Sequence, residues 1–214
     1  MAEEKGVAPG GDERRRQPKQ TRSMETRNSI LEAAASLFDE KGYEQTTTHQ
    51  IATRANVSVG ALYRYFADKQ AILTEVYARE TIALRDRILG EFSFVDLLGK
   101  DLRALLRKAI EAVFQVYTDR PGLRRTLSEQ ARKIGALAEM RRSQEQEIHR
   151  ALRQLLSSPG VRVPDVDVAA YLIALFVESL ADDYVLYRSK DGSLDPERVV
   201  ESMVDLLLRF ALDK

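Results

Sequence analysis

The sequence lacks cysteines, which cross-link many small folds, and it lacks the long apolar runs that cross a membrane. It has no cysteine among 214 residues, which excludes both a disulfide framework and a thiolate metal site. No apolar run reaches the roughly 18 residues that a membrane span needs. The N-terminal stretch MAEEKGVAPGGDERRR contains no apolar segment of the kind found in secretory signals. We therefore expect a cytoplasmic protein in a reducing compartment.

Catalytic signatures are also missing. The two histidines, His49 and His149, lie far apart in the sequence, and the chain contains no GxSxG, P-loop, GxGxxG or HExxH pattern. His49 falls just inside a short predicted helix, where a phosphate or solvent is a more natural neighbour than a metal ion. We expect neither an enzyme nor a protein with a metal or cofactor.

Charge is present in quantity, but it is unevenly spread. The net formal charge is zero, yet residues 14–70 hold ten Lys/Arg against six Asp/Glu (+4), and residues 71–214 hold 22 against 23 (−1). Five basic residues fall within RRRQPKQTR, residues 14–22. Residues 1–13 have no periodicity, so we expect a disordered basic arm over 1–23. It is either a solubilising tail or an arm that lies along DNA.

Helical spacing of apolar residues dominates the rest of the chain. The first helix is predicted over about 24–41, with Gly42 as the residue that ends it. Thr47 and Gln50 form an S/T-x-x-E/Q capping box, which starts a second helix of about 47–55. Ser58 caps a third short helix, 59–66, and Asp68 caps a fourth that runs to about residue 90.

Five further helices are predicted beyond residue 90, at about 96–119, 122–131, 135–158, from Asp165 or Asp167 to about 189, and from Pro196 onward with Asp195 as its cap. No stretch alternates with a period of two. The prediction is an all-α protein of about nine helices, with a three-helix head over 24–84 and a larger helical bundle over 85–214. The head holds a helix-turn-helix at about 47–66.

A helix-turn-helix places its second short helix in the major groove of DNA. Val59, Leu62 and Phe66 share one face and would pack into the head, leaving Tyr63 and Tyr65 on other faces. Tyr offers a ring to sugar and thymine-methyl surface and a hydroxyl to a phosphate. Each tyrosine has an ordinary explanation as a half-buried surface residue, but within a helix-turn-helix frame they favour DNA.

Two neighbours of these tyrosines point the same way. Gly60 near a helix N-terminus costs roughly 1 kcal/mol relative to Ala, which is reasonable where a backbone or phosphate must come close. Lys69 at the first position of the fourth helix opposes the helix dipole by about 0.3–1 kcal/mol, and a bound phosphate would reverse that sign. A glycine kink and an ordinary surface lysine are the alternatives.

The stretch ILEAAASLFDEKGYEQTTTHQIATRANVSVGALYRYFADKQAIL, residues 30–73, resembles the DNA-binding head of the TetR family of transcriptional regulators. The resemblance carries the IL..AA..LF helix, the GY turn, the TTT..IA..A helix and the S.G.LY.YF..K segment, with flanks from about 24 to 84. It implies a homodimer that binds a palindromic operator and usually represses. It also implies a divergent C-terminal body that binds a small ligand and then releases DNA.

The same resemblance implies which residues contact DNA: Thr47, Thr48, Ser58, Val59, Gly60, Ala61, Tyr63, Tyr65 and Lys69. Val59 departs from the family pattern, because many members carry a basic residue there. A phosphate contact would be lost at that position, and the 14–22 arm would compensate for it.

The last two predicted helices are apolar on wide faces. The eighth offers Leu172, Leu175, Phe176, Leu180 and Leu186, and the ninth offers Val199, Met203, Leu206, Leu207 and Phe210. Two such helices bury one face in their own domain, and a second apolar stripe suits a dimeric four-helix interface. The resemblance to the TetR family implies the same dimer.

A ligand pocket is expected among helices four to eight. The candidate lining residues are Phe114, Gln115, Tyr117, Leu137, Met140, Phe176, Glu178 and Tyr184, although plain core packing explains each of them as well. Gln115 or Glu178 would serve as polar handles. Acidic Glu178, Asp182 and Asp183 favour a cationic ligand, unless they simply face solvent.

These observations predict a sequence-specific DNA-binding regulator, a ligand-released repressor that binds its operator as a dimer. Its partners would be double-stranded operator DNA, a small-molecule effector and a second copy of the chain, with no membrane. Two alternatives stay open: a DNA-binding regulator that needs no ligand, and a helix-turn-helix module that binds protein. The basic head and the exposed tyrosines favour DNA over protein.

Overall fold

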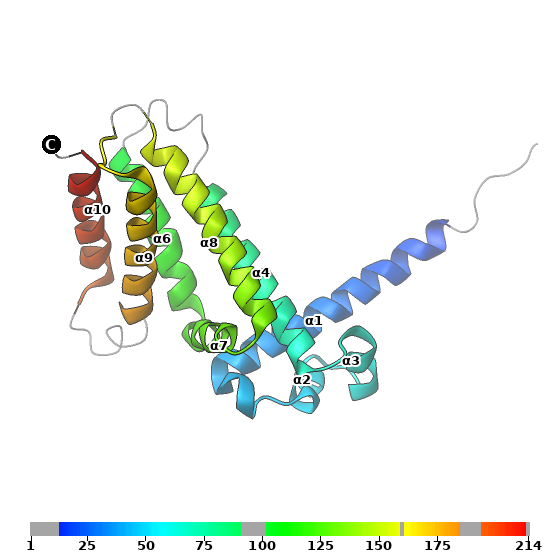
Figure 1. Cartoon of the computed structure of the whole chain (residues 1–214). Coiled ribbons are helices and arrows are strands. Elements are labelled where there is room, and N and C mark those ends of the chain that lie inside the picture. The colour runs from blue at the N-terminus through cyan, green and yellow to red at the C-terminus, as the bar shows by residue number, and fades with distance from the viewer. Residues whose placement is uncertain (1–12, 91–101, 159–160, 185–193, 213–214) are drawn as a thin grey trace, which may run out of the picture.

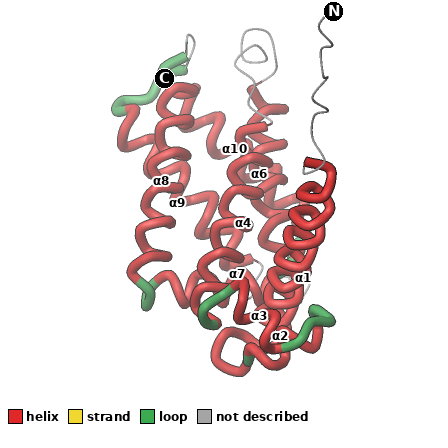
Figure 2. Tube along the Cα trace, turned by 90° about the vertical axis from the view of Figure 1, so that its right-hand side faces the viewer, coloured by secondary structure: helices red, strands yellow, loops and turns green. Residues whose placement is uncertain are grey.

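The computed structural model describes residues 13–90, 102–158, 161–184 and 194–212. Within these ranges the chain forms nine helices and no strand, and the tube in Figure 2 is helical over nearly all of its described length. The predicted all-α class is confirmed. Across the same ranges no helix has the length and apolar character needed to cross a membrane.

Helix α1 (Glu13–Gln45) begins eleven residues earlier than the predicted start at Met24. The expectation of an irregular arm over 1–23 is therefore wrong from Glu13 onward, while residues 1–12 lie outside the described part of the chain. Arg, Gln and Lys are strong helix formers, so a basic composition does not prevent a helix. The predicted end is confirmed, since Gly42 has a positive φ of 77° and interrupts the helical path.

The three following helices are fixed by the caps that the sequence indicates. Helix α2 (Thr48–Arg54) has the reciprocal capping box between Thr47 and Gln50. Helix α3 (Val59–Tyr65) starts at Ser58, whose hydroxyl accepts the Ala61 N–H. Helix α4 (Lys69–Gly90) starts after Asp68, whose carboxylate accepts the Ala71 N–H at 2.7 Å. Each bond satisfies a donor that would otherwise lack a partner in the first turn.

The body contains α6 (Leu102–Asp119), α7 (Pro121–Ala131), α8 (Gly135–Leu156), α9 (Val166–Asp183) and α10 (Pro196–Leu212). Asp165 caps α9 by accepting the N–H groups of residues 167 and 168, and Asp195 caps α10 by accepting the Arg198 N–H. The predicted cap at Asp195 is confirmed, and of the two candidates predicted for α9 the cap is Asp165 rather than Asp167. The predicted helical stretches at 96–101 and 185–189, including Leu186, lie outside the described residues.

Buried apolar residues form two cores. The head core joins α1, α2, α3 and α4, and it is completed by Leu123, Leu127 and Ala131 of α7 and by Leu137 of α8. The body core joins α6, α9 and α10 with the end of α8. The packing therefore does not divide at residues 84 and 85, because α4 continues across that point and α7 closes the head.

The joint between α1 and α7 is tight. The Asp39 carboxylate accepts the Leu123 N–H at 2.8 Å, and the buried Thr126 hydroxyl donates to the Phe38 carbonyl at 3.1 Å. A side-chain carbon at Gly122 would lie 2.0 Å from the Asp39 carbonyl oxygen. Only glycine therefore lets these two helices approach so closely.

The arrangement separates a small head from a long bundle. Figure 1 shows α2 and α3 at one end of the molecule, with α4 running from them along the bundle beside α8. Helices α9 and α10 lie on the far side of the bundle, and α1 extends outward past the head. The view in Figure 2 likewise places α2 and α3 at the extremity of the molecule.

Candidate DNA-binding surface and effector cavity

Tyr63 and Gly60 form the open face of α3. The Tyr63 side chain is held upright by a 3.0 Å hydrogen bond between its hydroxyl and that of Thr48 in α2, and the residue is 50% exposed. A side-chain carbon at Gly60 would meet no atom of the described chain within 4 Å. The fold therefore does not require glycine here, and the backbone of α3 is accessible to a partner molecule.

Arg64 is a residue of this face that the sequence prediction omitted. It lies in the last turn of α3, is exposed, and has no ion pair with any described residue. Nearby Arg54, in contrast, is paired with Glu40. The position of Arg64 beside Tyr63 was the signal available in the sequence, since a cation on a helix predicted to face the major groove suits a phosphate or a guanine.

Several other residues predicted to contact DNA pack within the head or cap its helices. Val59 and Tyr65 are half-buried and pack against the head core. The Tyr65 hydroxyl accepts a 3.3 Å hydrogen bond from Ser23 of α1, so part of its ring is covered by the protein itself. Thr47 and Ser58 are exposed caps, and Ala61 is half-buried.

The side chain of Lys69 is committed to the protein. Its ammonium donates to the Tyr43 carbonyl at 2.7 Å and to the Thr46 carbonyl at 2.8 Å, and it lies 4.1 Å from the centre of the Tyr43 ring. Burial lowers its pKa. The Lys69 side chain therefore joins the end of α1 to the start of α4. This role differs from the predicted one, in which the ammonium was free to bind a phosphate.

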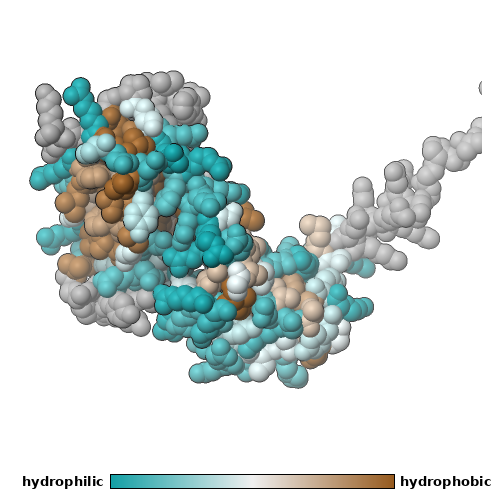
Figure 3. All heavy atoms as spheres, viewed as in Figure 1, coloured by the Kyte–Doolittle hydropathy of each residue, from teal (hydrophilic) through white to brown (hydrophobic). Residues whose placement is uncertain are grey.

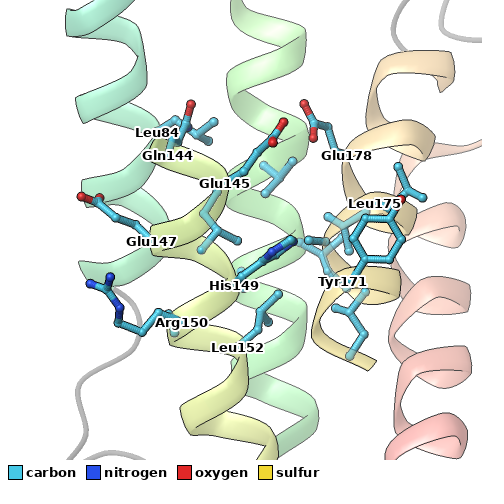
Figure 4. A pocket seen from close by; sticks show the side chains of 18 of the residues that line it. Leu84, Gln144, Glu145, Glu147, His149, Arg150, Leu152, Tyr171, Leu175 and Glu178 are labelled. Atoms are coloured by element: carbon cyan, nitrogen blue, oxygen red, sulfur yellow. The ribbon is translucent and has the colours of Figure 1, made fainter. Parts of the chain in front are cut away.

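A cavity of about 770 Å³ lies within the body. Its wall comes from α4, α6, α7, α8 and α9, which are the five helices expected to surround a pocket, with Leu207 of α10 closing it. Most of the lining is apolar, and the volume falls within the range of small-molecule sites. Figure 4 shows His149 of α8 pointing toward Tyr171 and Leu175 of α9 across the opening.

Charged side chains gather at one part of this cavity. Arg124 of α7 donates to the Tyr117 hydroxyl at 2.6 Å, and one Glu178 oxygen lies 3.6 Å from Arg124 and 3.7 Å from Arg141. Arg141 also donates to Glu145 at 2.8 Å. Figure 4 shows Glu145 and Glu178 lying close together although they come from different helices. Burial raises the pKa of Tyr117 to about 12.

Two of the eight predicted ligand residues, Tyr117 and Glu178, line this cavity. Phe114 and Tyr184 instead stack in the body core, with ring centroids 5.7 Å apart. Phe176 also packs against that core. Helical periodicity identifies these residues as inward-facing, but it does not distinguish a packed interior from a cavity wall.

The other three predicted residues lie elsewhere. Leu137 is fully buried in the head core, Met140 packs against that core, and Gln115 is exposed on α6. The acidic pair considered as ligand handles, Asp182 and Asp183, does not line the cavity either. The prediction missed many apolar lining residues, and it also missed polar ones that read as surface positions in sequence, above all Arg124 and Arg141.

The exposed faces of α9 and α10 carry an apolar surface. We call this the α9/α10 patch, and its members are Val168, Tyr171, Leu172, Leu175, Leu206 and Phe210. Figure 3 shows brown surface gathered where Figure 1 places these helices. The remaining predicted interface residues in the described chain pack inward, since Met203 and Leu207 are buried and Val199, Phe176 and Leu180 pack against the body core.

A helix-turn-helix head joined to a helical body with a largely apolar cavity defines the class of small-molecule-responsive DNA-binding regulators. Residues 30–76 match the family of bacterial regulatory proteins called the tetR family. Residues 101–210 match the tetracyclin repressor-like C-terminal domain. The chain belongs to the TetR family of bacterial regulatory proteins.

Individual relatives are more distant. The chain is 37% identical over 107 residues to the A-factor receptor protein of Streptomyces griseus, covering 45% of this chain and 39% of that protein. It is 34% identical over 103 residues to the HTH-type transcriptional repressor KstR of Mycobacterium tuberculosis, covering 44% and 47%. The aligned part thus spans less than half the length of these curated relatives.

Solved structures extend the likeness across the fold. A transcriptional regulator from Rhodococcus sp. Rha1 has a TM-score of 0.72 at 21% identity, covering 86% of this chain and 97% of that chain. The TetR family regulator PfmR from Thermus thermophilus has a TM-score of 0.63 at 25% identity, covering 86% and 99%. At such identities the likeness concerns the fold.

Proposed function

We propose that the protein is a transcriptional repressor that binds a palindromic operator as a homodimer and releases it when a small molecule occupies the body cavity. The observation that carries DNA binding is the open face of α3. Gly60, Tyr63 and Arg64 lie together on it, and neither the packing of the head nor an ion pair within the described chain accounts for them.

Each part of this face has a role in the proposed complex. Tyr63, oriented by Thr48, contacts base edges or sugars in the major groove. Gly60 lets the sugar–phosphate backbone approach, and Arg64 supplies a cation. A phosphate near α4 is bound through N–H groups of its first turn, because the Lys69 ammonium is already used. Basic residues 14–22, at the start of α1, add phosphate contacts outside the groove.

The homodimer is proposed to form through the α9/α10 patch. The exposed apolar residues on these helices make a surface larger than scattered single residues, of the kind that marks an interface. A two-fold axis would pair the patch with itself and produce a four-helix arrangement.

The effector is proposed to occupy the cavity among α4, α6, α7, α8 and α9. Among the wall helices that reach the head, α4 begins there and α7 packs on α1. A ligand that prefers a different placement of either helix would change the spacing of the two α3 helices in the dimer. Its occupancy would then lower operator affinity by a coupling of typically about 1–3 kcal/mol.

Replacing Tyr63 tests the DNA-binding face. Wild-type protein should select a palindromic duplex from random-sequence DNA, and binding to that duplex is then followed by fluorescence anisotropy. Tyr63→Ala should weaken it by about 1 kcal/mol or more, as expected for a lost specific contact. Tyr63→Phe keeps the ring and should lose only the contribution of the hydroxyl. Equal affinities of wild type and Tyr63→Ala, with the dimer intact, would remove α3 from the interface.

A further inference from the structure

Arg124 is an unusual residue for the wall of an apolar cavity. Its side chain is only 19% exposed, although it carries a full positive charge. The guanidinium stacks on the Tyr117 ring at 4.3 Å and makes one hydrogen bond to the described residues, to the Tyr117 hydroxyl. The Arg124 Nε is buried and has no hydrogen-bond partner among those residues. A guanidinium has five N–H donors in a planar fork, so most of this donor capacity is unused.

The neighbouring carboxylates do not fill that capacity. Glu178 is 3.6 Å from Arg124, it lies at a similar distance from Arg141, and the Tyr117 hydroxyl donates to it at 3.5 Å. Glu145 is already bonded to Arg141. Tyr117 stays protonated at neutral pH and offers no negative charge to Arg124, since its pKa is raised to about 12. The acceptors in this corner are therefore shared among several donors, while the Arg124 Nε still lacks one.

The remainder of the cavity suits a hydrocarbon. Leucine and isoleucine side chains from six helices make up much of its wall, among them Leu84, Leu106, Ile110, Leu152, Leu155 and Ile173. A molecule that fills this space buries apolar surface against these side chains and meets the buried guanidinium of Arg124 at one part of the wall. The apolar wall suits the hydrocarbon part of a ligand, and the Arg124 guanidinium suits a polar group at one end of it.

We propose that the effector is an amphipathic acid whose carboxylate binds the Arg124 fork and whose apolar body lies along the leucine-rich wall. Bidentate Arg–carboxylate pairing supplies both charge and geometry at a buried position. A cationic ligand is disfavoured, since Glu178 is already held by Arg124, Arg141 and Tyr117. This inference rests on the proposed function, because it names the chemistry of the effector that the cavity binds.

A matched series of probes tests the head group. Decanoic acid, decan-1-ol and decylamine share one chain, and each is titrated calorimetrically into the full-length protein. We expect the acid to bind at least about tenfold more tightly than the alcohol, and the amine most weakly. Decanoic acid should also lower the affinity for the selected duplex, whereas decylamine should not.

Arg124→Met should remove the preference for the acid and leave the affinity for the alcohol largely unchanged. Arg124→Lys keeps the charge without the fork and should retain part of the preference, which also covers the case in which the methionine variant fails to fold. Arg142→Met is the control, because Arg142 is an exposed α8 arginine that does not line the cavity. It should rank the three probes as wild type does.

Several results would overturn the inference. Tightest binding of decylamine would make Glu178 the anchor, and equal binding of acid and alcohol would make the site purely apolar. Failure of octanoic, decanoic and dodecanoic acids to bind at all would exclude an acid of this kind. Binding of the ligand-free protein to its selected duplex is measured in parallel. Its absence would refute the proposed function whatever the ranking of the probes.

Discussion

At the scale of single residues, Gly60 separates the needs of the fold from those of DNA binding. Gly60→Ala adds a carbon that meets nothing within 4 Å and favours a helix, so the protein should be unchanged in stability or more stable by up to about 1 kcal/mol. The same carbon would stand between α3 and an approaching DNA backbone. We expect clearly weaker binding to the selected duplex.

Gly135→Ala is the matched control, because this α8 glycine also has no atom within 4 Å of an added carbon and lies outside the head. It should preserve both stability and DNA affinity. Thermal unfolding and anisotropy on the three proteins check the pair of expectations. If Gly60→Ala binds DNA as wild type does, the backbone of α3 does not approach its partner closely.

The position of Lys69 was predictable from the sequence, but the partners of its ammonium were not. The sequence correctly places it at the first position of a helix beside the head, and there a cation is unfavourable for the helix dipole. The three-dimensional reason lies elsewhere in the chain, in two carbonyl groups near the end of α1. No local pattern records that a turn 23 and 26 residues earlier offers acceptors to this ammonium.

At the scale of helices, the junction of α1 and α7 is the feature most sensitive to side-chain size. Gly122→Ala would place a carbon 2.0 Å from the Asp39 carbonyl oxygen, an atom of the backbone that cannot rotate away. We expect a loss of about 1–3 kcal/mol in the free energy of unfolding, typical of an overpacked contact. Gly135→Ala again serves as control, and denaturant unfolding measures both.

Unchanged stability of Gly122→Ala would show that α7 can withdraw from α1 at little cost. That outcome would weaken the idea that α7 transmits changes in the cavity to the head. A marked loss would identify the contact as rigid, and Arg124 lies on the same short helix only two residues further along.

Local signals predicted five of the helix starts well, because each of these five is set by a nearby side chain. The caps at Thr47, Ser58, Asp68, Asp165 and Asp195 all appear where the sequence places them. Contacts between helices that are distant in the sequence could not be predicted from these local signals. The role of α7 in closing the head core depends on contacts between residues more than eighty positions apart, as in the bond from Leu123 to Asp39.

The cavity was the least predictable part of the site. Its location among five helices follows from their order along the chain, but its lining depends on small rotations of each helix about its axis. Tyr117 and Glu178 face the space, while Phe114, only three residues before Tyr117, faces the body core. Arg124 reads as a surface residue in sequence, because composition does not reveal that α7 is covered on several sides.

At the scale of the whole molecule, the proposed binding to operator DNA requires two copies of the chain acting together. Dimeric helix-turn-helix proteins hold their two recognition helices about 34–36 Å apart to enter successive major grooves. A monomer offers one α3 and half of the contacts. The α9/α10 patch lies at a distance from the head, so its disruption should affect DNA binding without touching the DNA-binding face (Figure 1).

The measurement that tests this central claim most directly compares two matched glutamate substitutions by analytical ultracentrifugation with the selected duplex. Leu206→Glu changes a 56% exposed residue of the patch, and Ile82→Glu changes a 48% exposed residue of α4 outside it. We expect Leu206→Glu to be a folded monomer whose DNA affinity falls by about a hundredfold or more, since the second half-site no longer binds as part of one molecule. Ile82→Glu should remain a dimer with wild-type affinity. A dimeric Leu206→Glu, or a monomer that binds the duplex as tightly as wild type, would contradict the account.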